Sequence, residues 1–260
     1  MKRTGNAFLN TVAVFTLAAV ALLVMTMPGV LQADYAGAIA ADKESVKGAF
    51  KKPGYSPYAG RNFPTKVLWG DTHLHTALSL DARAFGVTLG PEEAYRFALG
   101  EEVTASHGER VKLSRPLDFL VVADHSDGMG AMSEIIKGNP NLLRDATVKD
   151  WYDRIIQGGD SALMATMDVI EAFTEGKIPK VLQDRKFSRS IWSRYLDTAE
   201  KFNDPGRFTT IIGYEWTSTP GGDNLHRNVL YRDGAETARQ VLPYTSAESM
   251  NPEDLWKWME

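Results

Sequence analysis

Short runs of strand-forming residues, each followed by histidines or acids, constrain the fold of this chain more than any other feature. The runs and their motifs are Lys66–Trp69 before Asp71, His73 and His75; Phe119–Ala123 before Asp124 and His125; and Phe208–Ile212 before Glu215. Helix-type patterns lie between them. Strands that alternate with helices indicate an α/β fold with a parallel sheet, whose strand ends share one edge.

The first motif predicts a metal site. Imidazole and carboxylate groups are the ligands that borderline divalent metals prefer. Alternate residues of a strand point to the same side, so His73 and His75 can face one centre. Asp71 shares that face, and we expect it either to bind the metal or to orient one of the histidines.

Further residues extend the predicted site. His125 follows a strongly apolar strand, and Asp124 is expected to hold it. Glu215 comes just past another apolar strand, where a carboxylate costs energy unless it is paired, as a bridging ligand would be. His226 lies at the start of a fourth strand, and Asp81 is equally consistent with a ligand and a turn residue.

The remaining pattern is mainly helical. A helix is predicted from Pro91, and residues 139–203 are predicted to be helical with breaks at Gly158 and around Gly176. An apolar stripe from Ile191 to Ala199 indicates core packing. Asn251 is expected to cap a last helix. Four recognisable strands are too few to close a barrel, so we expect the chain to be the N-terminal part of a longer protein.

The N-terminus has the order of a secretory signal peptide. Lys2 and Arg3 precede an apolar stretch, and small residues follow it. We therefore predict a signal peptide over residues 1–40, a linker over 41–62 and a domain over 63–260. An uncleaved anchor helix is the alternative. Cleavage would leave no stable membrane span and would place the protein in the periplasm or outside the cell.

Composition excludes several functions. Removing residues 1–40 takes two of the 29 basic and one of the 33 acidic residues, which leaves a net charge of −5. Such a chain has no general attraction for nucleic acid or anionic membranes, so we expect no nucleic-acid partner. There is no cysteine, which excludes a thiol nucleophile, thiolate metal sites and disulfides.

Several strings together resemble the PHP superfamily, named for polymerase and histidinol phosphatase, and most closely an exported bacterial PHP-related domain family of unknown function. The strings are L-W-G-D-T-H-L-H-T, L-D-F-L-V-V-A-D-H, I-I-G-Y-E-W-T-S, N-L-H-R-N-V-L-Y-R and P-E-D-L-W. The resemblance implies a distorted (β/α)7 barrel of the PHP type, only its N-terminal part present here, with two or three divalent ions.

The resemblance also implies roles for individual residues. The matching metal ligands are His73, His75, Asp81 in place of a histidine, His125, the bridging Glu215, and His226. The later histidine and the C-terminal aspartate-histidine pair of the superfamily do not occur after His226. This departure agrees with a C-terminally incomplete domain and puts the catalytic competence of the chain alone in doubt.

The predicted activity is metal-assisted hydrolysis of a small-molecule substrate, with a phosphoester preferred. Zinc, manganese and iron all suit mixed histidine and carboxylate sites. Glu215 and Asp124 are the candidate catalytic residues. Arg83, Arg227 or Arg232 could contact a phosphate, although an ordinary surface salt bridge is the favoured interpretation of each. Two alternatives stay open: an amidohydrolase-like enzyme that acts on a non-phosphate bond, and a metal-binding module without catalysis. A serine hydrolase is disfavoured because the chain has no Gly-x-Ser-x-Gly elbow.

Overall fold

The computed structural model describes residues 66–220 and 223–260, which belong to one compact unit, Thr65–Glu260. The predicted signal peptide (1–40) and linker (41–62) lie outside the described residues. Across the described part of the chain, no helix combines the length and the apolar character that a membrane span requires.

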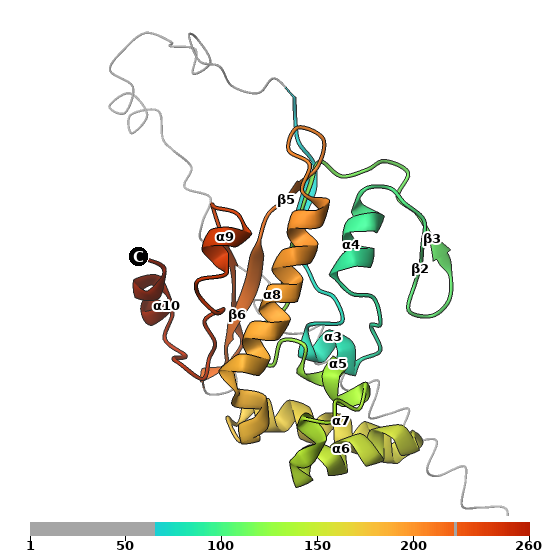
Figure 1. Cartoon of the computed structure of the whole chain (residues 1–260), viewed down its shortest axis with the longest axis vertical. Helices are drawn as coiled ribbons and strands as arrows, with labels where there is room; N and C mark the ends of the chain where they lie inside the picture. Colours follow the sequence, from blue (N-terminus) through green and yellow to red (C-terminus); the bar gives the residue numbers. More distant parts are fainter. Residues whose placement is uncertain (1–65, 221–222) are drawn as a thin grey trace, which may run out of the picture. The chain divides into compact units, whose positions relative to one another are not determined.

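The site is built on a small mixed sheet (Figure 1). Strands β1 (Gly70–Leu74), β4 (Phe119–Val122) and β5 (Thr209–Thr210) pair in parallel in the order β1-β4-β5, as the alternating pattern predicts. The chain then enters β6 (Gly213–Ser218), which pairs antiparallel with β7 (Leu225–Leu230). A parallel bridge between His125 and Glu215 joins β6 to the end of β4.

Two expectations about this sheet need correction. The fourth predicted strand is antiparallel, because the segment between β6 and β7 is far too short for the crossover that parallel strands need. The strands in residues 66–220 and 223–260 form no closed barrel, so a PHP-type barrel is not confirmed and the fold is mixed α/β. The Asn228 side chain on β7 donates a hydrogen bond to the Thr72 carbonyl on β1, which brings the β6–β7 pair next to the first strand.

Two helices that lie far apart in the sequence pack on the sheet and form the first core. Helix α8 (Arg185–Phe202) buries the predicted stripe from Ile191 to Ala199, which confirms its core role. It packs with α4 (Pro91–Ala98) around Tyr95, Trp192 and Trp216. The Tyr195 hydroxyl donates to the Val122 carbonyl at 3.1 Å and so ties α8 to the central strand.

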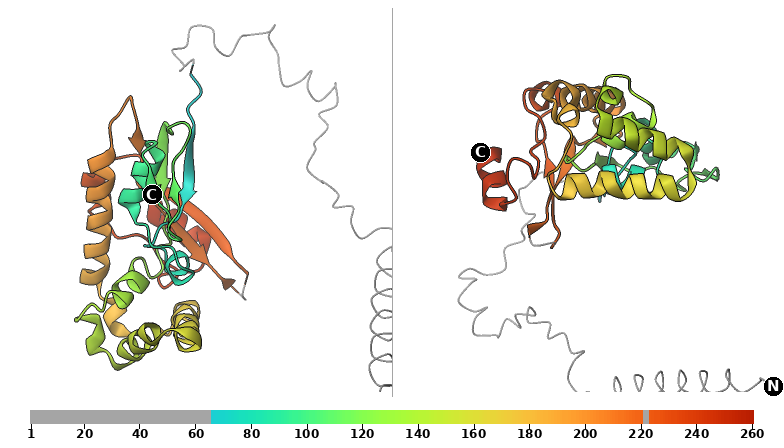
Figure 2. Two further views of the ribbon diagram at one scale, coloured as in Figure 1. Left: turned by 90° about the vertical axis from the view of Figure 1, so that its right-hand side faces the viewer. Right: turned by 90° about the horizontal axis from the view of Figure 1, so that it is seen from below.

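A second core lies among helices (Figure 2). It joins α3 (Leu80–Ala84), α5 (Ala131–Ile136), α6 (Ala146–Gln157) and α7 (Gly159–Thr174) through buried residues such as Met132 and Trp151. The predicted break falls at Gly158, whose φ of 81° suits glycine. The other elements are β2 (Val103–Thr104), β3 (Arg110–Val111), η1 (Leu142–Arg144), η2 (Lys180–Gln183), α9 (Ala235–Ala238) and α10 (Pro252–Met259), the last capped by Asn251 as predicted.

Candidate metal centre

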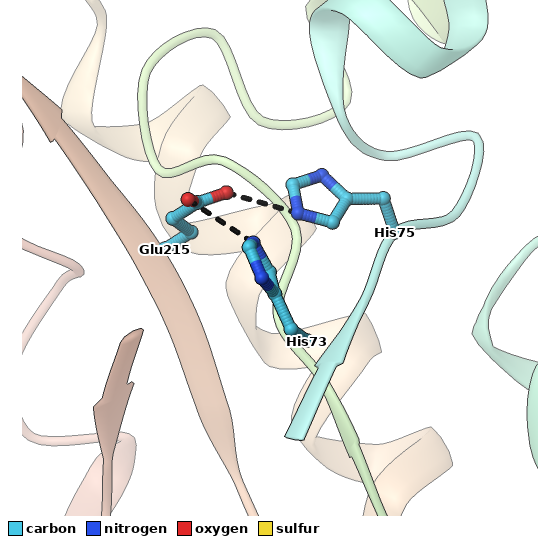
Figure 3. Close-up of side chains that lie close together, drawn as sticks. All are labelled: His73, His75 and Glu215. Atoms are coloured by element: carbon cyan, nitrogen blue, oxygen red, sulfur yellow. Dashed lines mark ion pairs between the residues drawn. The ribbon is translucent and has the colours of Figure 1, made fainter. Parts of the chain in front are cut away.

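Four histidines from distant parts of the chain surround one buried carboxylate, that of Glu215. Figure 3 shows two of them, His73 and His75, with both imidazoles directed at it. The nitrogen–oxygen distances to Glu215 are 3.1 Å for His73 Nε2, 2.9 Å for His75 Nε2, 3.3 Å for His125 Nδ1 and 2.9 Å for His226 Nδ1. Asp81 joins the edge of this group, 3.4 Å from His125 Nε2. The structure thus brings together six of the seven predicted ligands.

Strand geometry explains the convergence. Most of the histidine motif does not follow a strand, as the sequence suggested, but forms β1 itself. His73 lies within β1 and His75 comes directly after its last residue, and both side chains reach Glu215. Glu215 likewise lies within β6 rather than beyond a strand end. The bridge between His125 and Glu215 sets the second motif beside the third.

These separations suit shared metal ions. Two ligand atoms that bind one ion at about 2.1 Å lie roughly 3.0 to 3.4 Å apart, for octahedral to tetrahedral angles. The distances from Glu215 to the four imidazoles, 2.9 to 3.3 Å, agree with that spacing. The candidate ligands form three overlapping groups: His73, His75 and Glu215; His75, Asp81 and His125; and His125, Glu215 and His226. The His/Glu clusters could therefore bind metal.

The hydrogen bonds of Ser79 fix the protons of His75. Asp124 Oδ1 accepts backbone N–H groups of Thr76 and Ser79. An ionised carboxylate oxygen can only accept, so the single hydroxyl hydrogen of Ser79 points to this oxygen, at 3.0 Å. The Ser79 oxygen must then accept from the His75 Nδ1–H, at 2.8 Å, and from the His125 backbone N–H. A neutral His75 consequently presents a bare Nε2 lone pair to Glu215.

A bare nitrogen lone pair beside a carboxylate oxygen calls for a cation between them. His75 Nε2 lies 2.9 Å from Glu215 Oε2, and that buried oxygen receives no well-aligned hydrogen bond from the described residues. A proton would favour a nearly linear arrangement, whereas an ion bound to both atoms makes a bent one. The donor set therefore fits a divalent metal.

Thr217 lies on the other side of Glu215. Its hydroxyl lies 2.8 Å from His125 Nδ1 and 3.0 Å from His226 Nδ1. These are the same nitrogens that face Glu215, so in the metal-free protein Thr217 occupies atoms that an ion would take. Sequence reasoning missed Thr217, although it lies two residues after Glu215 and therefore on the same face of the strand.

The imidazoles around Glu215 oppose the effect of burial on the pKa of its carboxyl group. Burial alone would raise the pKa of the Glu215 carboxyl. In the metal-free protein, hydrogen bonds and positive charge from the imidazoles of His75, His125 and His73 outweigh burial and lower this pKa to about 2, whereas with a metal bound the neutral rings would present their lone pairs to the ion. The hydrogen bond from His125 similarly lowers the pKa of Asp81 to about 2. Both carboxyl groups are thus held ionised, as metal ligands need to be.

Two predicted acids lie in different surroundings. Asp124 does not contact the His125 ring but accepts four hydrogen bonds from Thr76 and Ser79. Burial raises the pKa of Asp124, and those hydrogen bonds oppose the rise. Asp71 is exposed, accepts the backbone N–H of His73 at 2.7 Å and belongs to none of the three ligand groups.

The centre opens to solvent on one side. The side chains of His73 and His226 are 53% and 38% exposed, whereas that of Glu215 is 2% exposed. Arg227 is exposed next to His226 and donates to its carbonyl. An apolar hollow of about 190 Å³ between β1, α4 and the β2–β3 hairpin has His75 in its wall, beside Val87, Leu89 and Phe97. His107 lies exposed in that hairpin and outside the ligand groups.

One comparison with known proteins identifies the family of the chain, and none of them describes its chemistry. The family described as "Protein of unknown function (DUF3604)" matches residues 62–260. No curated protein and no solved structure matches the chain. The resemblance to the PHP superfamily is therefore corrected: the matching family is DUF3604, and nothing found assigns the chain to that superfamily. The narrower expectation of a domain of unknown function is confirmed.

Proposed function

The chain belongs to the DUF3604 family, for which no function is described, and we propose that it is a metal-dependent hydrolase of small phosphoesters. One observation carries the proposal: four histidines from three separate motifs converge on the buried carboxylate of Glu215. A buried acid ringed by imidazoles is costly to build unless it binds cations.

Two divalent ions would fit this donor set, with Glu215 available as a ligand to them. His73 and His75 would hold one ion, and His125 and His226 the other, with Asp81 beside His125. When bound, such ions lower the pKa of a coordinated water and attract the oxygens of a phosphoryl group.

The protein's own residues orient these ligands. Ser79 keeps the proton of His75 on Nδ1, which leaves Nε2 for the metal, and Asp124 in turn fixes Ser79. We thus assign Asp124 a positioning part instead of direct catalysis. Thr217 contacts the Nδ1 atoms of His125 and His226 in the metal-free protein, and these contacts would give way to an ion bound at the same nitrogens.

Access and charge favour a phosphoester with an apolar organic part. The substrate would enter on the exposed side of His73 and His226, where the Arg227 guanidinium suits phosphate oxygens. The apolar hollow beside His75 suits the organic group. The predicted signal peptide places this activity in the periplasm or outside the cell, as a further part of the proposal.

The test combines metal analysis with turnover. The purified protein is analysed for bound metals and assayed with aryl phosphate monoesters and diesters. The His73→Ala, His75→Ala double variant should lose both metal and turnover. A His107→Ala variant should keep both, since His107 lies outside the ligand groups. Absence of metal from a folded wild-type protein supplied with zinc, manganese and iron would refute the proposal, and metal without ester turnover would redirect it to another scissile bond.

A further inference from the structure

A second hollow, which we call the helix-side pocket, lies between α3, α4, α5 and α8. Its volume is about 380 Å³, within the range of small-ligand sites. Its wall includes Ala77 and Leu78 from the segment after β1, and Pro91, Ile191 and Tyr195 from the helices. No member of the three metal-ligand groups lines it, so it is a separate site.

Three cationic side chains from three helices line the helix-side pocket. They are Arg83 on α3, Lys137 at the end of α5 and Arg194 on α8. Lys137 and Arg194 are exposed, whereas Arg83 is half-buried. The sequence suggested Arg83 as a phosphate contact of the active centre, but the structure places it in this pocket.

Both carboxylates in the wall are already engaged. Glu93 accepts the backbone N–H of Gly90 at 3.0 Å, within the cap of α4. Glu134 accepts from Arg194 and from Asn139, each at 3.0 Å. Among residues 66–220 and 223–260, no carboxylate lies within 4.0 Å of the Arg83 guanidinium, whose pKa burial lowers. Lys137 Nζ also lies 3.8 Å from Glu134, so the wall has three cations against two carboxylates, an excess of one positive charge, and the half-buried Arg83 is, among the described residues, the cation without a nearby carboxylate.

We propose that the helix-side pocket binds the carboxylate or phosphate group of a small organic anion at Arg83, with Lys137 and Arg194 at its rim. An oxyanion would compensate the half-buried guanidinium, which suits such groups because of its planar, forked donors. The apolar side chains in the wall, such as Leu78 and Ile191, would contact the organic part of the anion. This proposal does not depend on the proposed hydrolase activity.

Calorimetric titration of the purified protein with inorganic phosphate and with succinate, at constant ionic strength, tests the pocket and separates the two anion types. We expect saturable binding of at least one probe. Arg83→Gln should weaken it about tenfold or more, and Lys137→Gln by a smaller factor, about threefold. Arg207→Gln is the matched control, because Arg207 is a largely exposed arginine outside the pocket wall.

A second variant tests whether the probe binds at the metal centre instead of the helix-side pocket. The His73→Ala, His75→Ala protein should bind the same probe with unchanged affinity, whatever the outcome of the hydrolase assays. Thermal unfolding checks that each variant is folded; if Arg83→Gln is not, the loss in Lys137→Gln decides. The proposal is overturned if neither probe binds saturably, if binding ignores both pocket substitutions, or if it disappears in the histidine variant.

Discussion

Asp124, just past the end of β4, and Glu215, within β6, are two buried carboxylates whose surroundings differ in kind. Both residues are 1% exposed, and the Glu215 backbone N–H donates to the Asp124 carbonyl at 3.0 Å. The side chain of Asp124 accepts four hydrogen bonds from hydroxyl and backbone groups of one segment. The side chain of Glu215 faces four imidazoles, and its Oε2 lacks a well-aligned donor.

The difference shows that burial alone does not identify a functional acid. The hydrogen bonds of Asp124 are complete, so it stabilises the segment that carries His75 and Ser79. The hydrogen bonds of Glu215 are incomplete, and its neighbours are metal-type ligands, so it calls for a cation. Asp124 is therefore an anchor in this comparison, and Glu215 is the candidate ligand.

Glu215→Gln tests the ligand side and should have the largest effect. The amide keeps the shape of the side chain but removes the anionic bridge. We expect roughly a 1000-fold loss of metal affinity and of metal-dependent turnover, beyond the 10–100-fold losses typical of groups that only support ligands. Metal content and kcat/KM measure it. The exposed acid variant Glu171→Gln is the control, and retention of metal by a folded Glu215→Gln protein would contradict the assignment.

Asp124→Asn tests the anchor side and should act on stability first. The amide turns an acceptor into a donor that faces Thr76 or Ser79, so hydrogen bonds of a fully buried group are lost. We expect the free energy of unfolding of the metal-free protein to fall by about 2 to 4 kcal/mol. Urea unfolding measures it. An unchanged unfolding midpoint with abolished turnover would instead return Asp124 to a catalytic role.

The same two carboxylates show how far sequence reasoning reaches. Strand alternation correctly predicted that His73 and His75 face one side, because a period of two is a local property of the chain. The convergence of His226 and Asp81 on the same centre depends on how β7 and α3 pack, and local patterns only suggested it. No pattern in the sequence shows that Asp124 is an anchor and Glu215 a candidate ligand. The groups that surround each carboxylate come from residues distant in the chain, and the donors to Asp124 are an ordinary serine and threonine.

The fold was predictable in its parts but not in its closure. Helix α4 begins at its proline and α10 at its asparagine cap, because these signals act within one turn. The direction of β7 was predicted wrongly, because an apolar run of residues does not show which strand it pairs with or in which direction. Ser79 was missed as a functional residue because its role requires Asp124 and His75 together.

Ser79→Ala links the two sides of the comparison. It removes the acceptor that holds the His75 proton on Nδ1, so the ring can turn or change tautomer. We expect metal affinity to fall about 10- to 100-fold, with a smaller change in stability. Ser126→Ala is a matched control, because Ser126 is also buried and its hydroxyl has no partner among the described residues. Equal effects of the two substitutions would mean that Ser79 acts through packing alone.

The pH dependence of unfolding of the metal-free protein gives the smallest effect and separates Glu215 from Asp124. The pKa of Glu215 is lowered from 4.5 to about 2, so its contribution is present above pH 4.5 and is lost as the pH falls toward 2. Burial opposes protonation of His125, but Asp81 and Glu215 outweigh it and raise its pKa, so this contribution is present below pH 6.5 and is lost as the pH rises.

Stability without metal should therefore be highest between about pH 4.5 and 6.5. We expect a decrease on the order of 1 to 2 kcal/mol on the acid side, since repulsion among the charged imidazoles offsets part of the gain. Urea unfolding from pH 3 to 8 measures it. Glu215→Gln should reduce the acid limb, to which Asp81 also contributes because its pKa is lowered to about 2. Added metal should shift the maximum to higher pH, because metal competes with protons for the imidazoles. An acid limb that persists unchanged in Glu215→Gln would show that another carboxylate, and not the one ringed by histidines, controls it.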